Sequence, residues 1–109
     1  MQTGEIYVVQ FPALPSHEQS GIRPAVIVVD FPDLPVAQVI PLTTSENAKK
    51  YKHILVIEPD EENHLEKTSV AMLFQLRAVD KRRLKNKIGV LGEKDKEALM
   101  QSLKQMFGF

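Results

Sequence analysis

Residues 16–29 read SHEQSGIRPAVIVV, a polar loop that passes through glycine and proline into five consecutive apolar residues. The ring of Pro24 disfavours helical geometry for Arg23, so the chain enters the apolar stretch in an extended form. The apolar run indicates a strand over residues 25–31 that is buried on both faces. We therefore expect the Arg23 guanidinium at the mouth of a core strand. A lone arginine there often only pairs with a carboxylate, so a functional role requires partner residues from elsewhere in the chain.

Further strands and one helix are predicted around this strand. Runs rich in β-branched and aromatic residues, bounded by proline, glycine and polar residues, indicate strands. Pro41 lacks an amide hydrogen and indicates an edge or a bulge, and Asp80 can cap a short helical turn through Arg83 or Leu84. Apolar residues at helical spacing indicate a C-terminal helix that ends at Gly108. The expected strands are residues 5–11, 25–31, 36–43, 53–57, 68–79 and 87–91, and the expected helix is residues 93–107.

These elements predict a mainly β fold with helices, of the α+β class, in which antiparallel strands form a small barrel-like sheet that one helix closes. Within residues 68–79, alternation predicts one inward face and one face of mixed character. The inward face holds Val70, Met72, Phe74 and Leu76, and the other holds Ala71, Leu73, Gln75 and Arg77. In the helix, Leu99, Leu103, Met106 and Phe107 form a stripe that we interpret as core or dimer contact.

Composition bounds the possible functions. The 109 residues suit one domain, residues 1–109, and are 43% hydrophobic and 26% charged, which is typical of a globular protein. No cysteine is present, which excludes disulfides and thiolate metal sites. No targeting or membrane segment is recognisable, so a cytoplasmic location is expected. Fourteen basic and fourteen acidic residues cancel, so only local basic groups, at residues 49–52 and 81–87, are available to attract RNA or DNA.

The polar residues at predicted strand ends form the candidate site. They are Arg23, Thr43, Gln75 and Arg77, together with His17 and Glu18 on the loop. The three histidines lack metal-ligand spacing, and no glycine-rich phosphate loop or nucleophilic serine elbow occurs. The residues therefore indicate either metal-free acid–base chemistry without a cofactor, or binding alone.

Four motifs in series resemble the MazF/PemK (Kid-like) toxin family. They are Gly4-Glu5-Ile6, then His17-Glu18-Gln19-x-Gly21-x-Arg23-Pro24, then Pro41-Leu42-Thr43-Thr44-Ser45, and finally Gln75-Leu76-Arg77-x-x-Asp80. The resemblance covers nearly the whole chain in the correct order. It implies a homodimeric SH3-like barrel with appended helices. The implied protein is the toxin of a type II toxin–antitoxin pair, a ribosome-independent endoribonuclease that cuts single-stranded RNA at short sequences and halts translation.

The same resemblance assigns roles to individual residues. It implies that Arg23 and Thr43 are catalytic and that the PemK-like histidine is His17, with Glu18 either a base or a loop-capping acceptor. Such a site uses the RNA 2′-hydroxyl as nucleophile. Arg23 then stabilises the developing negative charge, His17 exchanges protons near neutral pH, and Thr43 fixes the phosphate. The expected RNA-binding residues are Gln19, Thr44, Ser45, Lys49, Lys50, Lys52, Gln75 and Arg77. RNA is expected across the dimer interface, where an antitoxin tail also binds and residues 49–52 border the cleft.

One position departs from the family pattern. In many members an acidic residue proposed as a base precedes the glutamine, whereas this chain has Phe74 before Gln75. Either His17 or Glu18 takes that role, or activity is weak.

Two alternatives stay open at this point. The gyrase-binding toxin CcdB has a similar fold, and residues 39–42 and the Met106-Phe107 ending resemble it slightly. The loop containing His17 and Arg23 is typical of the nucleases instead, and the C-terminal tryptophan that the gyrase binder uses is missing. The second alternative is a catalytically weak relative that survives as a binding module.

Overall fold

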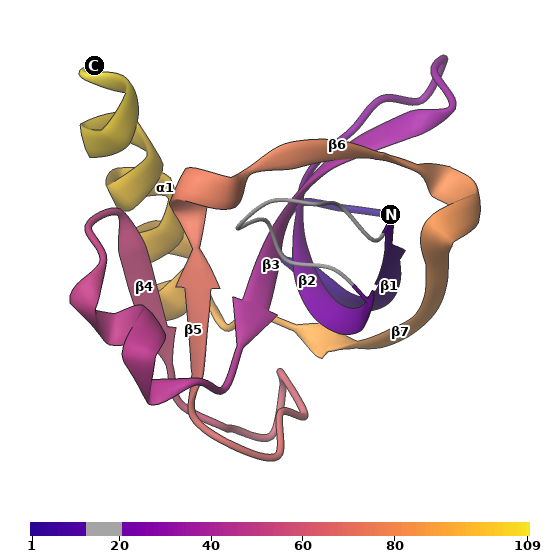
Figure 1. Ribbon diagram of the computed structural model, residues 1–109. Coiled ribbons are helices and arrows are strands. Elements are labelled where there is room, and N and C mark those ends of the chain that lie inside the picture. Colours follow the sequence, from indigo (N-terminus) through magenta and orange to yellow (C-terminus); the bar gives the residue numbers. More distant parts are fainter. Residues whose placement is uncertain (13–20) are drawn as a thin grey trace.

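The computed structural model describes residues 1–12 and 21–109, and these form a mainly β structure with one α-helix (Figure 1). The expected fold class is confirmed. Short 3₁₀ turns, labelled η, separate several strands. In chain order the elements are β1 (Glu5–Phe11), β2 (Gly21–Asp30), β3 (Val36–Thr43), η1 (Glu46–Lys50), β4 (Ile54–Ile57), β5 (Ser69–Met72), η2 (Leu73–Gln75), β6 (Arg77–Asp80), η3 (Lys81–Arg83), β7 (Leu84–Val90) and α1 (Glu93–Phe107).

The described strands form one antiparallel sheet with the order β4-β5-β3-β2-β1-β7, and β6 also pairs with β3. Because β6 continues through η3 into β7, the strands β6, β3, β2, β1 and β7 curl into a barrel-like unit (Figure 1). The hydrogen-bonded order of the described strands runs from β4 to β7 and does not close on itself. In that part of the chain, no helix has the length and apolar character needed to cross a membrane.

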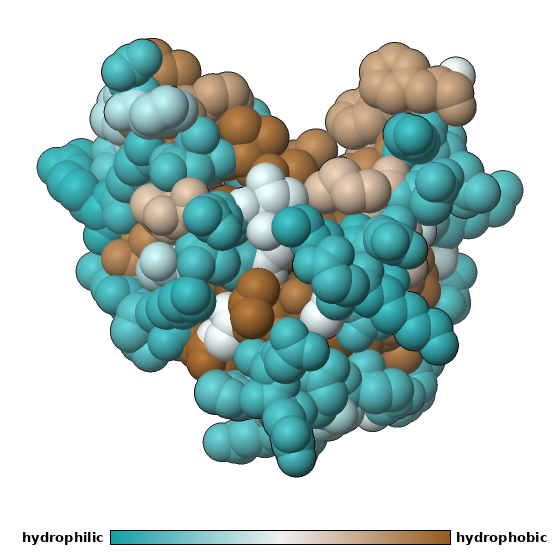
Figure 2. Space-filling model, turned by 180° about the vertical axis from the view of Figure 1, so that it is seen from behind, coloured by the Kyte–Doolittle hydropathy of each residue, from teal (hydrophilic) through white to brown (hydrophobic). Residues whose placement is uncertain are grey.

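Two projections frame a partly apolar hollow on the back of the molecule (Figure 2). They correspond to the β2–β3 hairpin and to the C-terminal end of α1, which also stand apart in Figure 1. At the helix end, the rings of Phe107 and Phe109 stack with centroids 5.9 Å apart, and Phe109 is 92% exposed. Large apolar side chains are therefore presented to solvent at this end.

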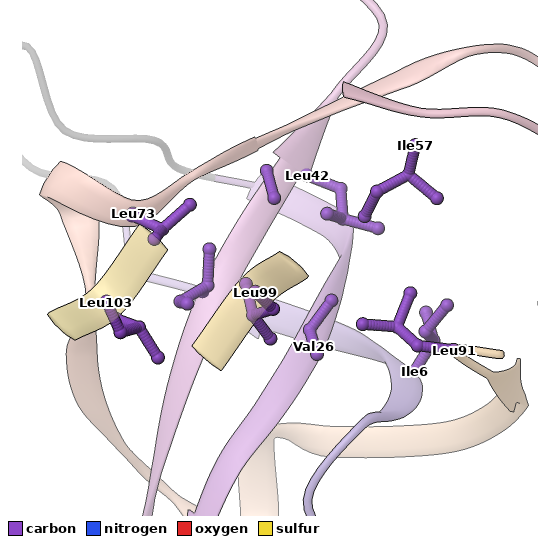
Figure 3. Packing of buried hydrophobic residues seen from close by; sticks show 10 residues of the cluster. Ile6, Val26, Leu42, Ile57, Leu73, Leu91, Leu99 and Leu103 are labelled. Carbon is purple, nitrogen blue, oxygen red and sulfur yellow. The ribbon is translucent and has the colours of Figure 1, made fainter. Parts of the chain in front are cut away.

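Alternate residues of β2 and β3 enter two different cores. One, the helix core, lies between the sheet and α1, where Leu99 and Leu103 pack on the strands (Figure 3). It comprises Ile6, Val26, Ile40, Leu42, Ile57, Ala71, Leu73, Leu91, Leu99 and Leu103. The barrel core lies on the opposite face of these strands and comprises Val9, Phe11, Ala25, Ile27, Ala37, Val39 and Val79. A smaller cluster of Ala48, Val70 and Met72 lies under η1. Both faces of β2 are thus buried, as the apolar run predicts.

The bounds of β1, β3 and α1 agree with the sequence predictions. Helix α1 has Glu93 and Asp95 in its first turn, where the helix dipole favours acidic side chains, and Gly108 ends it in the left-handed conformation at φ 81°. Asp80 caps η3 as predicted, its carboxylate accepting a 2.8 Å hydrogen bond from the backbone nitrogen of Arg82. The local sequence signals, namely apolar periodicity and capping residues, were therefore sufficient to predict these element boundaries.

The predicted continuous strand over residues 68–79 is wrong. Two short strands, β5 and β6, flank the turn η2, and both pair with β3, at Leu42–Thr43 and at residues 36–39 respectively. The backbone nitrogen of Leu73 donates to the His53 carbonyl at 3.0 Å, and Leu73 is fully buried in the helix core. Burial of Leu73 turns Phe74 outward, so the predicted inward position of Phe74 is also wrong.

Other boundaries differ because tertiary pairing extends or shortens a strand. β2 begins at Gly21, because residues 21–26 pair with β1, and β7 begins at Leu84 for the same reason. β4 begins one residue late, after His53, whose φ is +61°. Pro41 does not mark an edge. β3 is central, and Pro41 lies in the gap between its pairings with β6 and β5.

Candidate functional site

Arg23 and Thr43 lie on the same face of neighbouring strands. The pairs Ile27–Val39, Val26–Ile40 and Ala25–Pro41 define one antiparallel register between β2 and β3. That register, carried two residues further, aligns Arg23 with Thr43. Residues two apart in a strand share a face, so both side chains project on the barrel-core side, beyond Ala25 and Pro41. The sheet therefore starts the Arg23 and Thr43 side chains on one face, at the same end of the barrel core.

Thr43 is the last residue of β3 and is only 8% exposed. Its Oγ1 accepts a 3.2 Å hydrogen bond from the backbone nitrogen of Ser45, which fixes the start of the following loop. A hydroxyl that accepts one hydrogen bond still has a proton to donate. Thr43 can therefore hold the loop and bind an anionic oxygen at the same time.

Arg77 adds a second guanidinium to this face. It is the first residue of β6 and lies opposite Val39, a barrel-core residue, so its side chain starts on the barrel-core side. Its guanidinium carbon lies 4.3 Å from the centre of the Phe11 ring, a cation–π contact. Phe11 is buried at the end of β1, directly before the segment that joins β1 to β2. The ring thus holds a positive charge beside the strand ends.

A cavity of about 460 Å³ opens next to Thr43, bounded by the end of β3, η1 and η2. Its lining residues are Thr43, Ser45, Asn47, Ala48, Tyr51, Met72, Phe74 and Gln75. Gln75 Nε2 lies 4.0 Å from the sulfur of Met72, and the rings of Tyr51 and Phe74 are 5.2 Å apart at an interplanar angle of 53°. The cavity combines hydroxyl and amide groups with an aromatic wall.

A family model described as "PemK-like, MazF-like toxin of type II toxin-antitoxin system" matches residues 2–107. The chain belongs to this toxin family.

A relative named "Endoribonuclease MazF" from Staphylococcus saprophyticus is 34% identical to this MazF-like chain over 97 residues, which covers 86% of the chain and 80% of the relative. Among solved structures, MazF from Deinococcus radiodurans superposes with a TM-score of 0.81 at 20% identity, covering 100% of this chain and 97% of that one. A MazE–MazF structure from the same organism gives 0.74 at 17% identity, with coverage of 100% and 96%. At these identities the two structures show the fold alone.

In this MazF-like toxin the two consecutive threonines face different cavities. Thr44 is exposed and lines a second cavity of about 490 Å³ with Pro24, His64 and Ser69, whereas Thr43 lines the first. Successive residues at a strand end point to opposite sides. Thr43 and Ser45 thus share a cavity, and Thr44 is separated from it.

Two basic groups lie at opposite ends of the toxin, around η1 and around η3 (Figure 1). The first consists of exposed Lys49, Lys50 and Lys52. Lys49 forms a 3.1 Å salt bridge with Glu46, and Lys50 Nζ lies 5.4 Å from the centre of the Tyr51 ring at the cavity. The η1 group therefore borders the Thr43 cavity.

The second basic group is paired within the molecule. Lys81 bridges Asp30 at 2.8 Å, Arg82 bridges Asp80 at 3.1 Å and Lys87 bridges Glu5 at 2.7 Å. The pKa of the Asp80 carboxyl is lowered, chiefly by its hydrogen bond with the Arg82 side chain. These pairs join neighbouring elements and compensate much of the positive charge around η3. The two basic groups do not combine into one surface.

Three predicted site residues, His17, Glu18 and Gln19, lie outside the described residues. Among the described residues, no group of three or more histidine, aspartate or glutamate side chains is arranged to hold a metal ion. Sequence reasoning did not identify Asn47, Tyr51 or Phe74 as cavity residues. The turn η2 exposes Phe74, and the alternating pattern of residues 68–79 gave no signal for that turn.

Proposed function

We propose that this toxin is an endoribonuclease that cleaves single-stranded RNA at short specific sequences and thereby inhibits translation in the cytoplasm. The alignment of Arg23 with Thr43 on one face, beside an open cavity, is the observation that carries the proposal. Membership of the toxin family and the relative named "Endoribonuclease MazF" support it. The same match favours a nuclease over a CcdB-like gyrase binder.

The proposed reaction needs no metal or cofactor. The RNA 2′-hydroxyl loses its proton and attacks the adjacent phosphorus, which forms a 2′,3′-cyclic phosphate. The bond to the 5′-oxygen breaks, and that oxygen gains a proton as it leaves. Arg23 binds the phosphate oxygens, where negative charge develops, through its planar fork of donors. The Thr43 hydroxyl donates to the same phosphate and orients it.

Proton transfer is assigned to the loop residues His17 and Glu18. Phe74 precedes Gln75 and carries no ionisable group, so it cannot serve as a base. An imidazole is suited to gain and lose protons near neutral pH. We assign one of His17 and Glu18 to remove the 2′-hydroxyl proton and the other to donate the proton that the leaving 5′-oxygen gains, and we assign the remaining groups of the site to binding.

The RNA strand is proposed to extend from the scissile phosphate along the η1 side. Arg77, held by Phe11, binds a neighbouring phosphate. Ser45 and Gln75 contact the nucleotide in the Thr43 cavity. Lys49, Lys50 and Lys52 bind the backbone beyond it, and Gln19 and Thr44 make further contacts. Basic groups near the cavity make this binding salt-dependent.

The toxin is proposed to act as a homodimer and to be inhibited by a cognate antitoxin protein. The exposed, stacked Phe107 and Phe109 and the half-buried Met106 offer apolar surface for a second copy. The MazE–MazF structure is a fold neighbour that was solved as a complex. A molecular mass equal to one chain at micromolar concentration, measured by light scattering, would contradict the dimer.

The deciding experiment incubates the purified protein with a long RNA in excess EDTA. Wild type should produce site-specific fragments with cyclic phosphate ends. Arg23→Ala should lower the rate by about a hundredfold or more, whereas Arg82→Ala, on the η3 side, should leave it unchanged. Intact RNA with wild type would contradict the proposal, and capture of DNA gyrase together with intact RNA would establish the gyrase-binding alternative.

A further inference from the structure

Two aromatic rings on the wall of the Thr43 cavity are exposed side by side. Tyr51 follows η1 and is 51% exposed, and Phe74 lies in η2 and is 41% exposed. Their centroids are 5.2 Å apart and the ring planes are tilted by 53°. Neither ring belongs to one of the three hydrophobic clusters. The pair is therefore a surface feature that contributes little to the packing of the interior.

Exposed neighbouring aromatic side chains usually indicate a binding surface, because a folded chain gains more by burying them. Here the chain exposes Phe74 through a defined structural cause, since Leu73 is buried and Met72 belongs to the small cluster under η1. At η2, Leu73 and Met72 are therefore buried in the interior, and the Phe74 ring is left at the cavity.

The chemistry around the rings matches a nucleobase. The cavity of about 460 Å³ has polar groups from Ser45, Asn47 and Gln75 facing the same space as the rings. A side-chain amide offers both a donor and an acceptor, which is the combination that reads a base edge. The ammonium group of Lys50, 5.4 Å from the Tyr51 ring, adds positive charge beside this wall. Aromatic stacking with polar edge contacts is how proteins commonly hold unpaired bases.

We propose that Tyr51 and Phe74 form a stacking platform for one unpaired base of the RNA, with Asn47 and Gln75 contacting the edge of that base. The inference rests on the proposed function, because the nucleotide concerned has its phosphate at Thr43, which lines the same cavity. The platform makes this toxin require a base, and not only a phosphate, at that position of the strand.

Binding to a non-cleavable RNA tests the platform. The probe is a fluorescent 2′-O-methyl oligonucleotide that carries the sequence cleaved by wild type or, if none is cleaved, the tightest binder among mixed-sequence oligonucleotides. A second set of probes has an abasic nucleotide at each position in turn. The variants are Phe74→Ala, Phe74→Leu and Phe74→Tyr, with Leu34→Ala as a control for loss of an exposed apolar side chain on the β2–β3 hairpin.

Phe74→Ala should weaken binding of the intact probe by about 10- to 100-fold. Phe74→Leu should be nearly as weak, Phe74→Tyr should restore affinity, and Leu34→Ala should match wild type. With wild type, an abasic nucleotide at one position should cause a similar loss. With Phe74→Ala, the same abasic substitution should cause almost no additional loss, because the stacked pair is already broken.

Independent losses from the protein and RNA changes, or unchanged affinity in Phe74→Ala, would overturn the platform. A change in oligomeric state with unchanged RNA affinity would assign the rings to a protein contact and would also overturn it. Cleavage of unmodified RNA is scored separately. If wild type cleaves RNA but the losses of affinity from Phe74→Ala and from the abasic nucleotide are independent, only the platform is refuted. If the two losses are not independent but wild type does not cleave RNA, only the nuclease proposal is refuted.

Discussion

The guanidinium carbon of Arg77 lies 4.3 Å from the centre of the Phe11 ring, which joins the start of β6 to the end of β1. Both residues border the face that carries Arg23 and Thr43. The Phe11 ring is buried in the barrel core, so its position is fixed by packing and it can in turn orient the arginine. A core residue thereby controls a charged group at the candidate site.

Phe11→Leu should separate this positioning role from core packing. Leucine keeps most of the apolar contact but removes the ring face, so we expect a stability loss of about 1 kcal/mol from the changed packing. RNA affinity should fall about 3- to 10-fold because Arg77 loses a cation–π contact. Urea unfolding and binding of a 2′-O-methyl RNA measure the two effects. Arg77→Ala should weaken binding in the Phe11→Leu background less than in wild type, and equal effects in the two backgrounds would contradict the coupling.

Thr43→Val should strongly lower the cleavage rate while only modestly lowering the free energy of unfolding. Valine has a similar shape but no hydroxyl, so the Ser45 backbone nitrogen loses its acceptor and the phosphate loses a donor. We expect a rate about 10- to 100-fold lower at saturating RNA and a stability loss of about 1 kcal/mol. Thr43→Ser retains the hydroxyl and should retain most of the rate. Equal cleavage rates for the valine and serine variants would contradict a role of the Thr43 hydroxyl in the reaction.

The Glu5–Lys87 pair should contribute to the acid sensitivity of folding. Lys87 Nζ lies 2.7 Å from Glu5 Oε2, and the hydrogen bond with Lys87 is the largest cause of the lowered pKa of Glu5. Because this pKa is lower in the folded state, the contribution is fully present above the ordinary value of 4.5 and is lost as the pH falls through the folded pKa.

Glu5→Gln tests that contribution by urea unfolding between neutral pH and pH about 3. The variant should be less stable than wild type near neutral pH, and the difference should shrink as the pH falls. Glu97→Gln, which removes an exposed carboxylate of α1, serves as the control. A stability difference between Glu5→Gln and wild type that is the same at every pH would contradict the linkage.

Gly89→Ala should destabilise the fold strongly. A Cβ atom at position 89 would lie 2.5 Å from the Glu62 carbonyl oxygen and 2.6 Å from that of Asn63, and both are backbone atoms that cannot move away easily. Asn63 is itself held by hydrogen bonds from the backbone nitrogens of Asp60 and Leu65. We expect a loss of about 2–3 kcal/mol in the free energy of unfolding. Gly108→Ala, where no atom lies within 4 Å, should cost only about 1 kcal/mol through its positive φ.

Local patterns predicted much of the fold because several elements depend on their own residues. Helix α1 has acidic residues at its start, a buried Leu99–Leu103 stripe and a terminating glycine, and each of these signals acts within a few residues. The apolar part of β2, residues 25–29, was recognisable because both of its faces contribute to buried cores, which leaves no polar alternation. The position of Thr43 at the end of β3 followed from the same pattern, whereas Arg23 lies inside β2, where it pairs with Val9.

The sequence by itself determined the antiparallel β class and the C-terminal helix, because periodicity and helix caps are local properties. It proposed Arg23 and Thr43 as a candidate pair through the resemblance of their motifs to the toxin family. Only the tertiary structure decided that residues 68–79 divide into β5, η2 and β6, since that break depends on two separate pairings with β3 and on the burial of Leu73. The exposure of Phe74 beside Tyr51 follows from that break. A local sequence pattern does not determine which of two apolar neighbours, Leu73 or Phe74, packs into the core, because that core is formed by residues distant in the sequence.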